Sequence, residues 1–200
     1  TLVNLACVLK DSGSPKQAEI FLKDALKINP SYDFALINLG AVLNQLEKFD
    51  EGEEYLRKAL SINSSSPIAL NNLGNILSNK NNNKEAELCY RKAIKIKSDF
   101  SLAYNNLGSL LSKQGNIVEA EIFTQKAINF NPKFELAYVN LGSIKVDLDK
   151  LTEAEELFLS AIELNENYNY AYGNLFRLYE KTNKISKLKN KIESLKQNKN

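Results

Sequence analysis

Apolar side chains recur along the chain in one pattern that repeats every 34 residues. Within each repeat they fall at helical spacing in two consecutive stretches, which a short polar turn separates. A Leu, usually before a small residue, marks the phase of each repeat, and the six markers are Leu5, Leu39, Leu73, Leu107, Leu141 and Leu175. A fixed period of this length is typical of a solenoid, because one helix pair cannot bury its apolar face alone. The pattern therefore predicts an all-α fold, a solenoid of antiparallel helix pairs.

The stretch 101–134 shows the complete plan, with a helix pattern, a Gly-bearing turn, a second helix pattern and a Pro stop. In the same phase the array divides into 1–32 (truncated at its start), 33–66, 67–100, 101–134, 135–168 and a degenerate 169–200. Three positions that are small in the earlier repeats become Phe176, Leu188 and Leu195 in the last. We expect this repeat to be a C-terminal cap, since a solenoid needs a terminal repeat with a polar outer face.

The turn between the two helices of a repeat is expected to need a left-handed backbone conformation. Eight residues after the marker the chain has residues that tolerate positive φ better than most, namely Gly13, Asn81, Gly115, Asp149 and Asn183. Glu47 occupies the same position in the second repeat and does not fit this explanation.

Small residues inside the helices predict close helix contacts. Gly is unfavourable in a helix interior by about 0.5–1 kcal/mol relative to Ala, so a neighbouring helix should pass near Gly40, Gly74, Gly108 and Gly142. We expect the facing residues to be the small Ala18, Gly52, Ala86, Ala120 and Ala154. Lys145 stands where other repeats have Leu, and its charge is expected to reach water.

Composition and charge exclude several classes of function. The chain has a net charge of +2 and no His, which speaks against nucleic-acid binding and excludes a His base, a catalytic triad or a His metal site. We expect no cofactor and no catalytic activity, and we interpret Glu51, Glu85, Glu119 and Glu153 as solvated helix charges. No apolar run is long enough to span a membrane. Cys7 and Cys89 are expected to be reduced thiols.

The spacing of these residues resembles the tetratricopeptide repeat family. The resemblance rests on a Leu-Gly step, Ala residues thirteen and twenty positions after the Leu, and a closing Pro, as in Leu107-Gly108, Ala120, Ala127 and Pro132. Thr124 departs from the family's large residue between the two Ala positions. The resemblance implies a right-handed superhelix whose first helices line a concave groove, where family members hold peptides or partner proteins.

An Asn precedes every marker, at Asn4, Asn38, Asn72, Asn106, Asn140 and Asn174. Asn is a mediocre helix former, but its carboxamide offers a donor and an acceptor to a peptide unit. This asparagine ladder is similar to that of O-linked N-acetylglucosamine transferases, where such residues hold the main chain of the substrate. Alternatively, each Asn pairs with an Asn of the next helix or meets water. Neighbouring first helices about 10 Å apart would let six Asn hold about fifteen extended residues.

A row of apolar residues lies four positions before the ladder, and so on the same helix face, at Phe34, Ile68, Leu102, Leu136 and Tyr170. They are candidate pockets for the side chains of a ligand, or else they pack against the preceding repeat. Asn71, Asn75 and Asn105 add neutral polar groups to the candidate groove.

Three other functions remain as alternatives or are rejected. Some relatives clamp a C-terminal carboxylate with Lys and Arg, but Ile68, Leu102 and Leu136 stand where the central repeats would need a cation. An RNA-binding helical repeat is disfavoured by the near-neutral charge.

The first residue falls inside a helix pattern, so the chain is expected to be part of a longer protein, either a binding scaffold or the substrate-recruiting arm of an enzyme such as a glycosyltransferase. The absence of targeting and membrane signals favours the cytoplasm as its location.

Overall fold

The computed structural model describes residues 2–184 and contains only helices and turns in that range. The predicted all-α repeat fold is confirmed. Each of the first five repeats contributes two helices of 13 or 14 residues, apart from a first helix of 10 residues, and the described part of the sixth contributes one helix of 13. The helices are α1 (Leu2–Asp11), α2 (Pro15–Ile28), α3 (Asp33–Gln45), α4 (Phe49–Ile62), α5 (Pro67–Asn79), α6 (Asn83–Ile96), α7 (Ser101–Lys113), α8 (Ile117–Phe130), α9 (Glu135–Asp147), α10 (Leu151–Leu164) and α11 (Asn169–Lys181). The predicted capping residues Leu188 and Leu195 lie outside the described residues.

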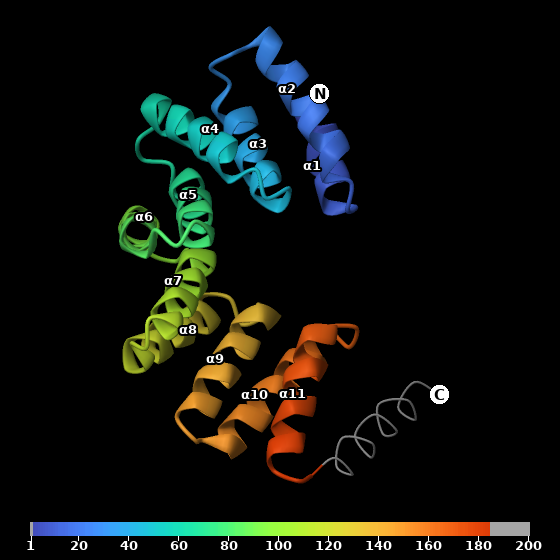
Figure 1. Cartoon of the computed structure of the whole chain (residues 1–200), viewed down its shortest axis with the longest axis vertical. Coiled ribbons are helices and arrows are strands. Elements are labelled where there is room, and N and C mark those ends of the chain that lie inside the picture. Colours follow the sequence, from blue (N-terminus) through green and yellow to red (C-terminus); the bar gives the residue numbers. More distant parts are fainter. Residues whose placement is uncertain (1, 185–200) are drawn as a thin grey trace. The chain divides into compact units, whose positions relative to one another are not determined.

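The chain forms two compact units, residues 1–106 and residues 107–200. In the first unit, α1 packs on α2, α3 on α4 and α5 on α6, and each first helix also contacts the first helix of the next pair (Figure 1). Its core includes Leu22, Leu36 and Leu39, all inaccessible to solvent. In the second unit α9 and α10 enclose Phe158, and α11 adds Leu175 to the same core. Each unit therefore has the stacked-pair core that the 34-residue period requires.

The turn between the helices of each repeat adopts the left-handed conformation that was expected. Gly13 and Gly115 have φ of 81° and 82°, and Asn81, Asp149 and Asn183 have φ between 56° and 61°. Glu47 has φ of 58° and so takes the same conformation without a residue type that favours it. The backbone geometry of the repeat, not the local sequence, imposes this conformation on Glu47, since the two helices must reverse direction within the same number of residues.

Replacing Glu47 by Asn is expected to raise the free energy of unfolding by about 0.5–1 kcal/mol. A side chain with a long stem is disfavoured at positive φ by about 1 kcal/mol, and Asn tolerates this region better. The check is chemical denaturation of both proteins at equal pH. Gly115→Ala is the matched control and should be destabilised, because it puts a Cβ at φ of 82°. A Glu47→Asn protein less stable than the original would contradict the assignment.

The mid-helix glycines lie at close helix contacts, as predicted. A Cβ on Gly40 would lie 2.4 Å from Leu56 Cγ, and a Cβ on Gly142 would lie 2.5 Å from Phe158 Cε1. The nearest atoms at these two glycines belong to a large side chain of the second helix, which was not predicted. The predicted small partners also lie close, since a Cβ on Gly108 would lie 3.1 Å from the carbonyl oxygen of Ala120, and a Cβ on Gly52 would lie 3.3 Å from that of Gly40.

Lys145 is buried, contrary to the expectation that its charge reaches water. Its side chain is 10% exposed and lies between α8 and α10, where Nζ donates to Glu121 Oε1 at 2.7 Å and to Glu153 Oε2. These two carboxylates raise the pKa of Lys145, the bond to Glu121 contributing most. Two nearby acids replace water as the charge partner, which the position of Lys145 within its own helix could not reveal.

Candidate functional site

The apolar row on the first helices is exposed in the first unit. Phe34, Ile68 and Leu102 are each the second residue of their helix, α3, α5 and α7, and they are 45%, 53% and 46% exposed. In the second unit Tyr170 is also exposed, while Leu136 is half-buried. Exposed apolar residues scattered singly are normal, but the same position on three successive helices forms a regular row. This row is the part of the predicted site that a ligand can reach most directly.

The ladder asparagines lie one turn further along the same helices, and several use their amide donors within the protein. Asn38 Nδ2 donates to the carbonyl oxygen of Phe34 at 2.8 Å, and Asn174 Nδ2 donates to that of Tyr170 at 2.8 Å. A backbone carbonyl can only accept, so these contacts orient both carboxamides. Asn4 is exposed, and Asn72 and Asn140 are half-buried. Asn38 Oδ1 also accepts from the Cys7 thiol at 3.5 Å. A carboxamide has two N–H donors and two acceptor lone pairs, so Asn38 and Asn174 each keep both a donor and an acceptor for a further bond.

Asn71, Asn75 and Asn106 form a polar cluster between α5 and α7. Asn106 Nδ2 donates to Asn71 Oδ1 at 3.0 Å and to Asn75 Oδ1 at 2.9 Å, and the Tyr90 hydroxyl donates to Asn75 Oδ1 at 2.8 Å. Burial raises the pKa of Tyr90, so the hydroxyl stays protonated and remains a donor. Asn71 is 4% exposed and Asn105 is 1% exposed. At this position the alternative interpretation, Asn paired with Asn of the neighbouring helix, describes the contact.

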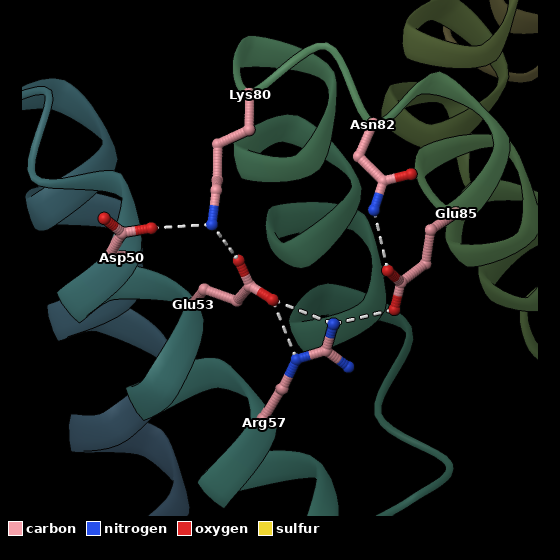
Figure 2. A network of polar contacts seen from close by, with 6 residues as sticks. All are labelled: Asp50, Glu53, Arg57, Lys80, Asn82 and Glu85. Atoms are coloured by element: carbon pink, nitrogen blue, oxygen red, sulfur yellow. Dashed lines mark hydrogen bonds and ion pairs between the residues drawn. The ribbon is translucent and has the colours of Figure 1, made fainter.

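The recurrent acids on the second helices form ion pairs between repeats. Lys23 bonds to Glu51 at 2.7 Å, and Arg57 bonds to Glu85 at 2.7 Å. Figure 2 shows that Glu53 binds two cations. Its carboxylate lies 2.8 Å from the guanidinium of Arg57 and 2.8 Å from the ammonium of Lys80. These bonds lower the pKa of Glu53, Lys80 contributing most. Exposed pairs of this kind each contribute little, and their positions across repeat boundaries suit alignment of helices, not catalysis.

Neither thiol nor acid clusters offer a reactive centre in the described part of the chain. Cys7 and Cys89 are free thiols, and burial raises the pKa of Cys89 to about 11. No group of three or more acidic or Cys side chains within residues 2–184 could hold a metal ion. In the same range no helix combines the length and the apolar character that a membrane span requires.

The second unit contains a cavity that was not predicted from the sequence. The cavity measures about 220 Å³ and lies between α9 and α11, with Phe158 of α10 among its lining residues. The only signal in the sequence is Arg177, a cation at a position that is Ala41, Asn75, Ser109 and Ser143 in the earlier repeats. That signal is weak by itself, because one charge on a helix usually faces water.

Comparison with known families gives one consistent result. Models of the tetratricopeptide repeat match residues 33–99, residues 89–122, and residues 1–32 together with 136–168. Together these matches cover most of the chain and follow the period described above. A comparison with curated proteins gives no match.

Solved structures with the same arrangement of helices are numerous, but their sequences are distant. PilF of Pseudomonas aeruginosa superposes with a TM-score of 0.78 at 19% identity, over 97% of this chain and 90% of its own. TTC0263, a thermophilic TPR protein of Thermus thermophilus, gives a TM-score of 0.81 at 15% identity, over 88% and 96% of the two chains. YrrB, described as a TPR protein with an unusual peptide-binding site, gives 0.59 at 22% identity, over 86% and 89%. At these identities the likeness concerns the fold.

Proposed function

Because the chain belongs to the tetratricopeptide repeat family, we propose that it is a non-catalytic scaffold that holds an extended segment of a partner protein on its first helices. One observation carries the proposal, the row of exposed apolar side chains Phe34, Ile68 and Leu102 beside the asparagine ladder. Exposed apolar residues that gather beside polar groups are typical of interaction surfaces, and this row lies one helical turn from the asparagine ladder. The structural relative YrrB has a peptide-binding site by its description, which supports a role of this kind.

The apolar row and the asparagine ladder would contact different parts of the partner. The apolar row takes side chains of the partner, and burial of each contributes through the hydrophobic effect at roughly 25 cal/mol per Å². The ladder meets the main chain, and Asn38 would offer its second N–H and the second lone pair of Oδ1 to a peptide unit, beside the bonds that it already makes to Phe34 and Cys7. Asn71 and Asn105 are buried and would support the surface from below without touching the partner. Asn106 joins them through its bond to Asn71.

Removal of the apolar row tests the proposal. We expect the triple variant Phe34→Ser, Ile68→Ser, Leu102→Ser to lose at least tenfold in affinity for 15-residue peptides selected by the original protein from a random phage library, which is about 1.4 kcal/mol. The measurement is fluorescence anisotropy with the selected peptides, and circular dichroism checks that helicity is unchanged. The row is already exposed, so its polar replacement should leave the core intact.

A matched control uses exposed apolar residues on the second helices. Ile20, Ile62 and Leu88 are 60%, 46% and 57% exposed, close to the values of the row. The variant with Ser at these three positions should bind the peptides as the original protein does. Equal binding by both triple variants would refute the proposal, and an additional Asn38→Ala, Asn72→Ala variant reports whether the ladder shares in the contact.

A further inference from the structure

The cavity in the second unit is shaped to receive one side chain. Ser143 and Val146 of α9 line one side, Asn174 and Leu178 of α11 line the other, and Phe158 of α10 is the aromatic member of the lining. Its volume of about 220 Å³ is below the range of about 300–1,000 Å³ that is usual for pockets that enclose drug-sized ligands. The size therefore suits a single apolar side chain of a larger partner and does not suit a cofactor.

The equivalent positions two repeats earlier carry a hydrogen-bonded cluster. There Tyr90 corresponds to Phe158, Asn75 to Ser143, Asn106 to Asn174 and Asn71 to Val139. The Tyr90 hydroxyl and the Asn106 amide both donate to Asn75 Oδ1, at 2.8 and 2.9 Å, and so tie α5, α6 and α7 together. At these positions the polar side chains are therefore paired with one another.

In the second unit the equivalent residues do not form this cluster, because they lack the required polar groups or bond within their own helices. Phe158 has no hydroxyl, and Val139 has no amide to offer to Asn174. Ser143 is short, and its Oγ donates to the carbonyl oxygen of Val139 in its own helix at 3.0 Å. Asn174 likewise donates to its own helix, at the carbonyl oxygen of Tyr170. The cavity is therefore lined by Phe158, Val146 and Leu178 together with polar side chains whose bonds stay within their own helices.

The rim of the cavity is cationic. Arg177 and Lys181 lie one turn apart on α11, and Asp147 of α9 is the single acid among the lining residues. Within residues 2–184 neither cation forms an ion pair, whereas cations elsewhere in the chain such as Lys23 and Lys145 each contact two carboxylates. Two cations that form no ion pair with the described residues, beside an apolar cavity, are complementary to an apolar group flanked by negative charge.

We propose that the cavity between α9 and α11 binds an acidic segment of the partner protein, with one apolar side chain inside the cavity and flanking Asp or Glu carboxylates on Arg177 and Lys181. This inference rests on the proposed function and adds the chemistry of the segment. The apolar side chain acts as an anchor, since enclosure in a pocket removes it from water more completely than contact with a surface row does. The carboxylates supply orientation, because Arg can hold a carboxylate through two N–H groups.

The test uses a defined peptide and the whole chain. The probe is the fluorescein-labelled peptide GSEELEESG, amidated at its C-terminus so that no terminal carboxylate is present. A second probe with a free C-terminus, and two others in which Leu becomes Ala or the four Glu become Lys, complete the set. Fluorescence anisotropy at two salt concentrations gives the affinities. We expect the acidic Leu probe to bind at least tenfold more tightly than the Ala and Lys probes, and the free C-terminus to add less than twofold.

Two double variants replace cavity residues by the residues that stand at equivalent positions in other repeats of this chain. Ser143→Asn with Phe158→Tyr recreates the hydrogen-bonded cluster and should reduce binding of the acidic Leu probe at least tenfold. Arg177→Ser with Lys181→Gln copies the residues of earlier repeats at these exposed positions and should also reduce binding at least tenfold, with loss of the salt dependence. Lys133→Gln, an exposed cation of the same unit, is the matched control and should bind as the original chain does.

The outcomes separate this inference from the proposed function. If the chain selects peptides from the random library but the acidic Leu probe does not bind, or binds both double variants as tightly as the original chain, the inference is overturned while the scaffold function stands. A tenfold preference for the free C-terminus would replace the internal acidic segment by a terminal carboxylate and would also overturn it. If neither the probe nor any library peptide binds, both proposals fail. If the variant Ser143→Asn with Phe158→Tyr does not fold, the variant Arg177→Ser with Lys181→Gln still tests the inference, because it changes only exposed side chains.

Discussion

Replacement of Gly142 by Ala is expected to destabilise the chain by about 1–3 kcal/mol, whereas the same replacement at Gly173 is expected to stabilise it by about 0.5–1 kcal/mol. Both glycines lie inside helices, α9 and α11, so the gain in helix propensity is the same. The difference comes from what surrounds them. A Cβ on Gly142 would lie 2.5 Å from Phe158 Cε1, while nothing lies within 4 Å of a Cβ on Gly173.

Packing, not propensity, decides the sign of this effect. Carbon atoms in contact prefer separations of about 3.5–4.0 Å, so α9 and α10 must move apart or Phe158 must leave its place when Gly142 gains a methyl group. Phe158 is 1% exposed and surrounded by core residues, which leaves it little freedom to move. Urea denaturation of the two single variants and of the original chain measures both changes. Stabilisation by both substitutions would show that the contact at Gly142 is looser than described.

Replacement of Lys145 by Ala is expected to lower the free energy of unfolding by about 1–3 kcal/mol, because it leaves a gap and removes the partner of two carboxylates. Replacement by Leu is expected to leave stability unchanged or to raise it. Leu43, Leu77 and Leu111 occupy the same position in earlier repeats and are buried there. A well-packed apolar residue avoids the cost of taking a charge out of water, which a buried ion pair repays only in part.

The pH dependence of stability identifies the ion pair as the cause. The bond from Lys145 lowers the pKa of Glu153 below its ordinary value of 4.5, so this stabilisation is present above pH 4.5 and is lost as the pH falls through the lowered pKa. The raised pKa of Lys145 acts at the other end: its contribution is present below the ordinary value of 10.5 and is lost as the pH rises through the raised pKa. Both slopes should be shallower in Lys145→Leu than in the original chain. Identical pH profiles of the two proteins would mean that the pair contributes nothing.

The fold was predictable because its information is local and repeated. The phase of Leu39, Leu73 and the other markers identified the helix pairs, and the residues eight positions after them identified the turns. Even the exception at Glu47 adopts the φ of its equivalents, because helices of fixed length that must pack on each other leave the turn one conformation. Periodicity is a property of the chain itself and needs no knowledge of three-dimensional neighbours.

The candidate site was predictable only in outline. The spacing of Asn38 and Phe34 places both on one helix face, and the structure shows Phe34 exposed there. The spacing of residues in the sequence did not reveal that Asn106 bonds to Asn71 and Asn75, or that Asn105 is buried. These contacts depend on the neighbouring helix, whose rotation and distance are set by the packing of the whole unit.

By itself, the sequence determined the helix pairs, the left-handed turns and the close helix contacts at the mid-helix glycines. Only the tertiary structure decided which side chain covers each Gly, where the charge of Lys145 finds its partners, and that a cavity lies beside Phe158 while Tyr90 bonds to Asn75. The physical reason is the same in all three cases. Hydrogen bonds, ion pairs and packing act over a few ångströms between residues from different helices, and the one-dimensional pattern records the periodic demand for burial but not those distances.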